Sequence, residues 1–276
     1  MRVIRYGLLA AAIGLAPMAA SAQTATGTLK WNGPGKSFAW YWRVGNAPTA
    51  TAEYVMGGGS YSAMFQMPTT PILYPWPAHG TTGFGPAVDI YCVDFSHWVN
   101  TSSSGYSAYF SKVTAGSLAN TREGEGGLTR YLSAAWLITK METYGTSTVA
   151  DKAQRAQIHG ALWWIMSGEP TGSWTGSGSA DANTGNYNNI DGLNSWVSQA
   201  QMASNYSTVN GSEWTVVTDA CVTNVNHNGA GTPVSDNCSQ EFLTHNVVPE
   251  PATMILMGTG LLATFMVVGI SRKQTA

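Results

Sequence analysis

Two apolar segments, one at each end of the chain, most constrain what this sequence can fold into. The first follows Arg2 and Arg5, runs over residues 8–16 and ends in the small-residue string ASAQ. A basic start, an apolar run and an A-x-A site are typical of a cleaved secretory signal peptide, since this run is shorter than the ~20 residues of a membrane span. We therefore predict that residues 1–22 are removed on export and take no part in the fold.

The second segment is an apolar run over residues 254–270 that is followed by Arg272 and Lys273. Its length is close to the lower limit of ~17 residues for crossing a bilayer. The run predicts a single transmembrane helix, and the basic pair would stay on the cytoplasmic side. By physical chemistry alone, this end of the chain is a C-terminal membrane anchor.

The residues around this run have a more specific order. Pro249, Glu250 and Pro251 precede the apolar run, and the Arg-Lys pair ends it. This order resembles the PEP-CTERM sorting signal of exported proteins in exopolysaccharide-producing Gram-negative bacteria. The resemblance implies that residues 248–273 are recognised by an exosortase, a membrane peptidase thought to cut there. The protein would then cross the inner membrane, stay anchored there transiently, and move to the cell surface or matrix; a plain tail anchor is the alternative.

Residues 23–247 are expected to form one extracytoplasmic domain, because no long linker interrupts them. Without the two terminal segments, 9 of the 13 Lys and Arg and 14 of the 15 Asp and Glu remain, a net charge near −5. Binding to nucleic acid is therefore excluded as a main function, since it needs a basic face that displaces counterions from phosphates. We predict no cofactor.

The order of elements predicts an α+β domain. TGTLKW, SFAWYWRV and AVDIYCVDF have the aromatic and β-branched content of strands. LTRYLSAAWLITKM has helical periodicity, Thr148 and Asp151 have the spacing of a capping box before a second helix, and a third helix is expected over about 192–203. Two strands follow, in EWTVVT and QEFLTHNVV. Strands, then helices, then strands suggest a β-sandwich or barrel with a helical insertion at about 128–204.

Three cysteines in an oxidising compartment favour one disulfide and leave one thiol over. Cys221 and Cys238 flank a loop between two strand-like segments, and we predict that they pair. A metal site formed by this pair with His227 would lack a fourth ligand, so no metal is predicted. Cys92 remains, apparently in mid-strand. It could be a buried free thiol, a thioester, a nucleophile or part of an intermolecular disulfide.

A second resemblance concerns Cys92. The string YCVD around it, followed by a helix that contains ALW, is similar to the thioester domains of bacterial surface adhesins. The resemblance implies a bond from the cysteine sulfur to a helix glutamine, which would capture an amine on a surface partner. The family pattern requires glutamine two residues before ALW, where this chain has His159. Gln157 lies two residues earlier, about 200° away around a helix, so periodicity does not choose between them.

If His159 faces Cys92, a different chemistry can be imagined. The imidazole would hold the thiol as a thiolate, and Asp94 would fix the imidazole tautomer in an acyl-transfer enzyme. Asp94 lies two residues from Cys92 along a strand and would project from the same face. His97 is expected to be a strand-end residue; the alternative is that it is a fourth polar member of this neighbourhood.

We expect a noncatalytic role in adhesion or matrix assembly, with exopolysaccharide or a surface amine as the partner. A carbohydrate-binding module is a further alternative, because exposed Trp and Tyr could stack on sugar rings. The candidate aromatics lie in the N-terminal strands and in the loop around Trp174.

Overall fold

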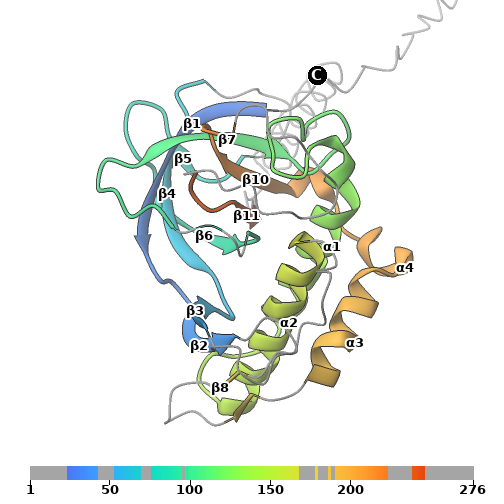
Figure 1. Ribbon diagram of the computed structural model, residues 1–276. Helices are drawn as coiled ribbons and strands as arrows, with labels where there is room; N and C mark the ends of the chain where they lie inside the picture. The colour runs from blue at the N-terminus through green and yellow to red at the C-terminus, as the bar shows by residue number, and fades with distance from the viewer. Residues whose placement is uncertain are drawn as a thin grey trace, which may run out of the picture.

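A closed β-barrel forms the body of the molecule (Figure 1). The computed structural model describes residues 24–42, 53–69, 76–94, 97, 99–167, 178–179, 186–187, 190–222 and 238–245. Within these residues, six antiparallel strands pair in a ring, in the order β1 (Thr24–Gly33), β7 (Tyr106–Lys112), β10 (Trp214–Asp219), β11 (Phe242–His245), β6 (Ala87–Cys92) and β4 (Tyr61–Gln66). β1 closes the ring, because its first half pairs with β7 and its second half with β4.

Side-chain alternation explains why these segments form a barrel. In β4, buried and half-buried residues alternate strictly, as expected for a strand with one face toward a core. Leu29, Phe65 and Phe110 are fully buried, and the two phenyl rings pack edge to face at 5.1 Å. Gly27 of β1 lies so close to the backbone of Gln66 that a Cβ would not fit, which allows the two strands to approach.

Among the described residues, five further strands lie outside this ring. β5 (His79–Gly80) pairs in parallel with β4. β2 (Phe38–Trp42) and β3 (Glu53–Gly57) form a separate antiparallel pair, and β8 (Gly178–Ser179) pairs with β9 (Asn186–Tyr187).

The helices lie together on one side of the barrel (Figure 1). They all come from the segment between β7 and β10. In chain order they are η1 (Glu125–Gly127), α1 (Leu128–Met141), α2 (Val149–Ser167), α3 (Ile190–Ala200), α4 (Ala203–Tyr206) and η2 (Gly211–Glu213). Thr148 Oγ1 accepts a hydrogen bond from the Asp151 N–H at 3.1 Å, so the predicted cap precedes α2.

The fold agrees with the predicted α+β class and with a helical insertion near residues 128–204. The sequence did not distinguish a β-sandwich from a β-barrel. The structure is a barrel, because β1 pairs with β4 as well as with β7 and so closes the sheet. In the part of the chain that the structure describes, no helix combines the length and apolar character needed to cross a membrane. The predicted signal peptide at 1–22 and the predicted span at 254–270 lie outside those residues.

Candidate functional site

Cys92 is the last residue of β6, where it pairs with Phe242 of β11. It is a free cysteine with no exposed surface, and its thiol donates to the Asp94 backbone oxygen at 3.3 Å. Burial, with the nearby Asp94 carboxylate, raises the pKa of the Cys92 thiol well above its usual range; contacts with Trp163 and the Asp94 backbone offset part of this. The thiol is therefore protonated at neutral pH and is a poor nucleophile.

His159 of α2 does lie beside Cys92, but it contacts the backbone. Its Nδ1 accepts from the Gly58 N–H at 2.8 Å, and its Nε2 is 3.0 Å from the Cys92 carbonyl oxygen, to which it donates. Burial is the main cause that lowers the pKa of His159 to about 4. Both ring nitrogens are thus occupied and the ring is neutral. The predicted activation of Cys92 by His159 is not present in this geometry, because no imidazole nitrogen is left to take the thiol proton.

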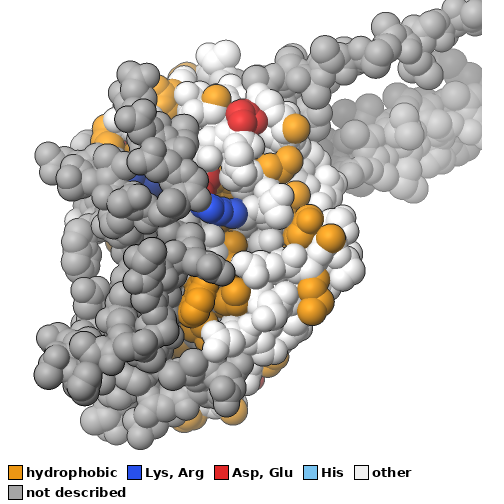
Figure 2. Space-filling model, turned by 45° about the vertical axis from the view of Figure 1, so that its right-hand side comes forward, with side chains coloured by type: hydrophobic (Ala, Val, Ile, Leu, Met, Phe, Trp, Pro, Cys, Tyr) orange, Lys and Arg blue, Asp and Glu red, His pale blue; other side chains and the backbone are white. Residues whose placement is uncertain are grey.

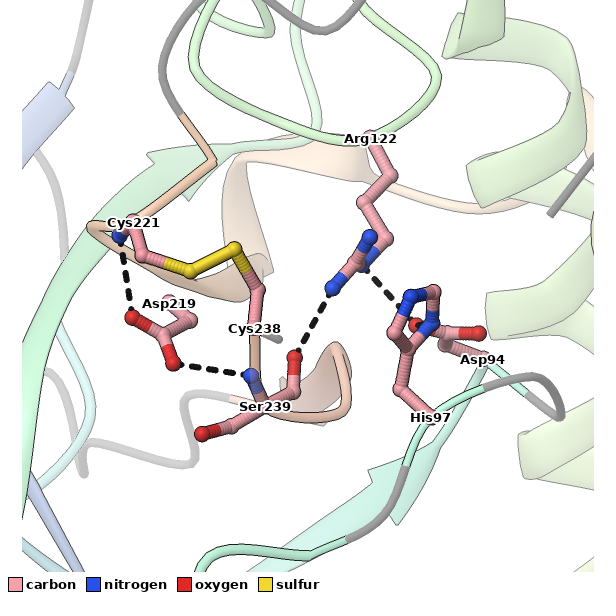
Figure 3. The surroundings of a disulfide bond; sticks show 7 residues. All are labelled: Asp94, His97, Arg122, Asp219, Cys221, Cys238 and Ser239. Atoms are coloured by element: carbon pink, nitrogen blue, oxygen red, sulfur yellow. Dashed lines mark hydrogen bonds and ion pairs between the residues drawn. A yellow bond between two sulfur atoms is a disulfide. The ribbon is translucent and has the colours of Figure 1, made fainter. Parts of the chain in front are cut away.

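Asp94 also has a different partner from the one predicted. Its Oδ2 lies 2.5 Å from His97 Nδ1 and 2.9 Å from Arg122 Nε, and all three side chains are about nine-tenths buried (Figure 3). The strand alternation that placed Asp94 on the same face as Cys92 does not apply, since β6 ends at Cys92. His97, which we expected to be a strand-end residue with a polar role near Asp94 as the alternative, is a member of this ion cluster.

Gln157 points away from Cys92. Its side-chain amide lies against Gly192 of α3, where a Cβ would collide with Gln157 Oε1. The structure therefore does not bring the Gln157 side chain to Cys92, the pair that the thioester hypothesis requires. The helix turns by about 200° over two residues, so α2 can present only one of Gln157 and His159 to β6.

A different glutamine lies near Cys92. Gln240 donates from Nε2 to the Asp94 backbone oxygen at 2.7 Å, and this is the same oxygen that accepts from the Cys92 thiol. The antiparallel register explains the meeting: Phe242 pairs with Cys92, so Gln240 falls opposite Asp94. No local sequence signal indicates Gln240, because the register joins segments that are 146 residues apart.

Glu241, the next residue, is buried at the centre of a set of hydrogen-bond donors. Its carboxylate accepts from the Tyr131 hydroxyl and the Thr218 hydroxyl, each at 2.6 Å, and from the Arg122 N–H at 2.9 Å. Burial raises the pKa of Glu241 to about 7, although these hydrogen bonds act in the opposite direction. Glu241 thereby connects α1, β10 and the segment before η1 to the start of β11.

The predicted pair of Cys221 and Cys238 forms a disulfide with the two Cα atoms 5.7 Å apart (Figure 3). The Asp219 carboxylate accepts from the Cys221 N–H at 3.0 Å and from the Ser239 N–H at 2.8 Å, so it joins both ends of the closed loop. Arg122 donates to the Ser239 carbonyl at 3.0 Å, which links the disulfide to the Asp94 cluster.

Among the described residues, no group of three His, Cys, Asp or Glu side chains could hold a metal ion. His227, the other member of the metal site weighed from sequence, lies outside those residues, as does the Trp174 loop.

Comparison with known proteins identifies the C-terminal segment. Residues 247–273 match the family model of the PEP-CTERM protein-sorting motif, and this range contains the Pro-Glu-Pro string and the Arg-Lys pair. No curated protein and no solved structure matches the chain, so no relative supports the thioester-domain resemblance. The matched segment is the sorting motif of exported PEP-CTERM surface proteins, which exosortases process at the membrane.

Proposed function

We propose that this protein is a noncatalytic component of the cell surface or biofilm matrix. A signal peptide at 1–22 exports it, the apolar run at 254–270 holds it in the inner membrane, and an exosortase releases it. The match of residues 247–273 to the sorting motif is the observation that carries this proposal.

The state of the side chains around Cys92 supports a role without catalysis. Cys92 is buried and protonated, His159 uses both nitrogens to bond backbone groups, and Asp94 is bound in an ion cluster. Each group that the acyl-transfer hypothesis needs is engaged in holding elements together.

The surface supports contact with a polar, uncharged partner such as an exopolysaccharide. Only 10% of the chain is charged. Figure 2 shows a face on which most of the described surface carries neither charged nor hydrophobic side chains. Hydroxyl and amide groups on such a face can exchange hydrogen bonds with sugar hydroxyls.

The sorting step is tested by replacing Pro249, Glu250 and Pro251 with Ala in the full chain. We expect the variant to accumulate in the membrane fraction with a higher mass than the released protein, as the wild type should in cells that lack the exosortase. Asn246→Ala, one residue before the matched segment, is the control and should be released normally. Release of the triple variant at the wild-type rate would contradict the proposal.

The matrix role is tested with protein recovered from the culture medium. We expect it to sediment with exopolysaccharide from the same cells and not with an unrelated neutral glucan. Deletion of the gene should weaken the matrix. Failure to sediment, together with an unchanged matrix, would argue against this role.

A second candidate function is covalent adhesion, and the position of Gln240 favours it. The Cys92 sulfur would attack the Gln240 side-chain carbon, so that a sulfur–carbon bond forms, the carbon–nitrogen bond breaks, and ammonia leaves with the thiol proton. A surface amine could later displace the sulfur, which would give an amide and return the thiol.

The intact mass of the released protein distinguishes the two candidates. A thioester predicts a mass lower by one ammonia, restored as an adduct by methylamine, in the wild type and in Gln157→Ala. The deficit should vanish in Cys92→Ala and in Gln240→Ala. A wild-type mass without the deficit would contradict covalent adhesion and leave the noncovalent matrix role as the proposed function.

A further inference from the structure

The residues between the disulfide and β11 form a strap next to the end of β6. All of them are more than nine-tenths buried, although none belongs to a helix or strand. The strap consists of Cys238, Ser239, Gln240 and Glu241. Val93, which follows β6, donates from its backbone N–H to the Glu241 carbonyl at 3.1 Å. Gln240 donates to the Asp94 carbonyl oxygen, the same atom that accepts from the Cys92 thiol. The strap therefore lies beside the buried thiol of Cys92.

The disulfide fixes the start of the strap in the register of the sheet. Val217 of β10 pairs with Phe242 of β11, so the same antiparallel register, continued by four residues, brings Cys221 opposite Cys238. Their Cα atoms are 5.7 Å apart, close to the ~5.5 Å of directly opposite residues in a hydrogen-bonded antiparallel pair. The disulfide thus links the strap to the end of β10 at the position that the strand pairing itself requires.

Two charged side chains hold the middle of the strap. The Asp219 carboxylate accepts from the Ser239 N–H, and Arg122 donates to the Ser239 carbonyl (Figure 3). These groups exchange their hydrogen bonds for bonds to water when the strap opens, so their net contribution is modest. The disulfide joins residues that are 17 positions apart, and closing a loop of this size favours the ordered state by at most roughly 100-fold. We therefore expect the disulfide to be the main constraint on the start of the strap.

A reductant can approach the disulfide more easily than any reagent can approach Cys92. Cys221 is an exposed residue, whereas Cys92 has no exposed surface. A thiolate of a dithiol reductant can attack the Cys221 sulfur, which breaks the sulfur–sulfur bond and releases Cys238 as a thiolate. The second thiol of the reductant then displaces Cys221. Two electrons pass to the protein, and the reductant ends as a disulfide.

From these contacts we infer that the disulfide is a redox-controlled fastening of the strap over Cys92. While the disulfide is intact, the strap stays closed and Cys92 is inaccessible. After reduction the strap opens locally from Cys238 to Gln240 and exposes the Cys92 thiol. Glu241 stays in place, because its carboxylate keeps donors from α1, β10 and the backbone of Arg122.

The fastening has a chemical consequence for Cys92. Opening removes the burial that raises the pKa of this thiol, so Cys92 gains thiolate character and becomes a better nucleophile. In the oxidising environment outside the inner membrane, the closed strap keeps Cys92 from pairing with another cysteine. This inference goes beyond the proposed surface or matrix role and does not depend on it.

Hydrogen exchange tests the opening without a label. The exported wild-type protein, with its disulfide intact, is compared with the double variant Cys221→Ser/Cys238→Ser. We expect the amides of Val93 and Ser239 to exchange at least tenfold faster in the double variant, within the limit set by loop closure. Peptides that contain Leu29 and Phe65, where β1 pairs with β4, should exchange within twofold of the wild type and serve as the control.

Alkylation of Cys92 by iodoacetamide tests its exposure. Cys92 is the only free thiol in both proteins, so the uptake of label reports on this residue alone. We expect labelling at least tenfold faster in the double variant, and equally fast in wild type that has been reduced with dithiothreitol and freed of it, as judged on the peptide that contains Cys92. Addition of about 1 M urea should change the rate in the double variant by less than twofold, because a local opening exposes little surface.

Two results would overturn the inference. Equal exchange at Val93 and Ser239 in the oxidised and reduced forms would show that the strap stays closed without the disulfide. Equal acceleration in the strap and in β1 and β4, with labelling that rises steeply with urea, would show that the disulfide stabilises the whole fold and does not control the strap. If a thioester blocks Cys92, neither protein takes up label, and hydrogen exchange alone decides.

Discussion

At the scale of single residues, Lys112 is the least expected feature of the barrel. It is fully buried, donates to the Thr215 hydroxyl at 3.2 Å, and lies 4.6 Å from the centre of the Trp76 ring. Burial lowers the pKa of Lys112 from 10.5 to about 7. Between these two values the unfolded chain binds more protons than the folded protein, so the free energy of unfolding rises with pH.

We predict that Lys112→Met flattens this dependence. The variant should be more stable than the wild type at pH 6, on the order of 2 kcal/mol, because methionine has no charge to desolvate. Urea unfolding at several pH values from 6 to 10 measures the slope. Lys30→Met, at a partly exposed position in β1, should keep the wild-type slope, and an unchanged slope in Lys112→Met would contradict the prediction.

Glu241 gives a dependence of opposite sign at lower pH. Its pKa is raised from 4.5 to about 7, so between these values the folded protein binds more protons than the unfolded chain. The free energy of unfolding should therefore fall as the pH rises from 4.5 to 7, by on the order of 2–3 kcal/mol. Glu241→Gln should remove this fall, whereas Glu213→Gln, at an exposed acid, should retain it. Acid-side urea unfolding makes the comparison.

At the scale of elements, Arg155 explains how α2 is joined to its neighbours. It is buried and donates to the carbonyls of Gly58, Met141 and Tyr144 at 2.5, 2.9 and 2.8 Å, and its Nη2 pairs with Glu142 at 2.7 Å. One side chain of α2 thus provides hydrogen-bond donors both to the backbone carbonyls at the C-terminal end of α1 and to the carbonyl in the turn after β3.

Removal of this side chain should be costly. We predict that Arg155→Met loses about 3–5 kcal/mol of unfolding free energy, since several buried acceptors lose their donor. Arg130→Met should lose at most about 1 kcal/mol, because the Arg130–Glu123 pair is partly exposed. Urea unfolding measures both losses. Equal losses of unfolding free energy in the two variants would show that the buried contacts of Arg155 stabilise the fold no more than an exposed ion pair does.

At the scale of the whole molecule, the barrel depends on its last strand. β11 has only four residues, yet it fills the gap between β10 and β6 and supplies the fully buried Phe242 and Leu243. The barrel therefore cannot close until β11 is available to pair with both of its neighbours. The disulfide across the loop before β11 stabilises the folded barrel by on the order of 3 kcal/mol, because it reduces the conformational entropy of the unfolded chain.

Truncation tests this dependence. A chain that ends at His245 should unfold cooperatively on heating, whereas one that ends at Glu241 should lose its near-ultraviolet circular dichroism, since two strand edges and the core next to them are exposed. A cooperative transition in the shorter chain would show that β11 is dispensable for the fold.

The elements of this fold could be read from the sequence because their signals are local. Helical periodicity, the capping box before α2 and the β-branched strands each depend on residues a few positions apart. The third helix, expected at 192–203, is observed at Ile190–Ala200, which is the usual uncertainty at helix ends. The pairing of Cys221 with Cys238 was predicted because an exported protein enters an oxidising compartment and only a short loop separates the two cysteines.

The surroundings of Cys92 could not be read in the same way. Sequence reasoning placed Gln157 or His159 against it by helical position, and placed Asp94 beside it by strand alternation. The structure brings His159 to the backbone, binds Asp94 to His97 and Arg122, and puts Gln240 next to the thiol. Each of these outcomes depends on where a strand ends or on which distant strand pairs with it.

The sequence by itself therefore determined the two apolar ends, the sorting motif, the order of strands and helices, and the disulfide. The tertiary structure alone decided that the sheet closes into a barrel, that Lys112 and Glu241 are buried, and that β1 begins and β11 ends at the same end of the barrel. The physical reason is range: propensity, periodicity and loop closure act between residues near in sequence, whereas register and burial are set by packing between segments that the chain separates by a hundred residues or more.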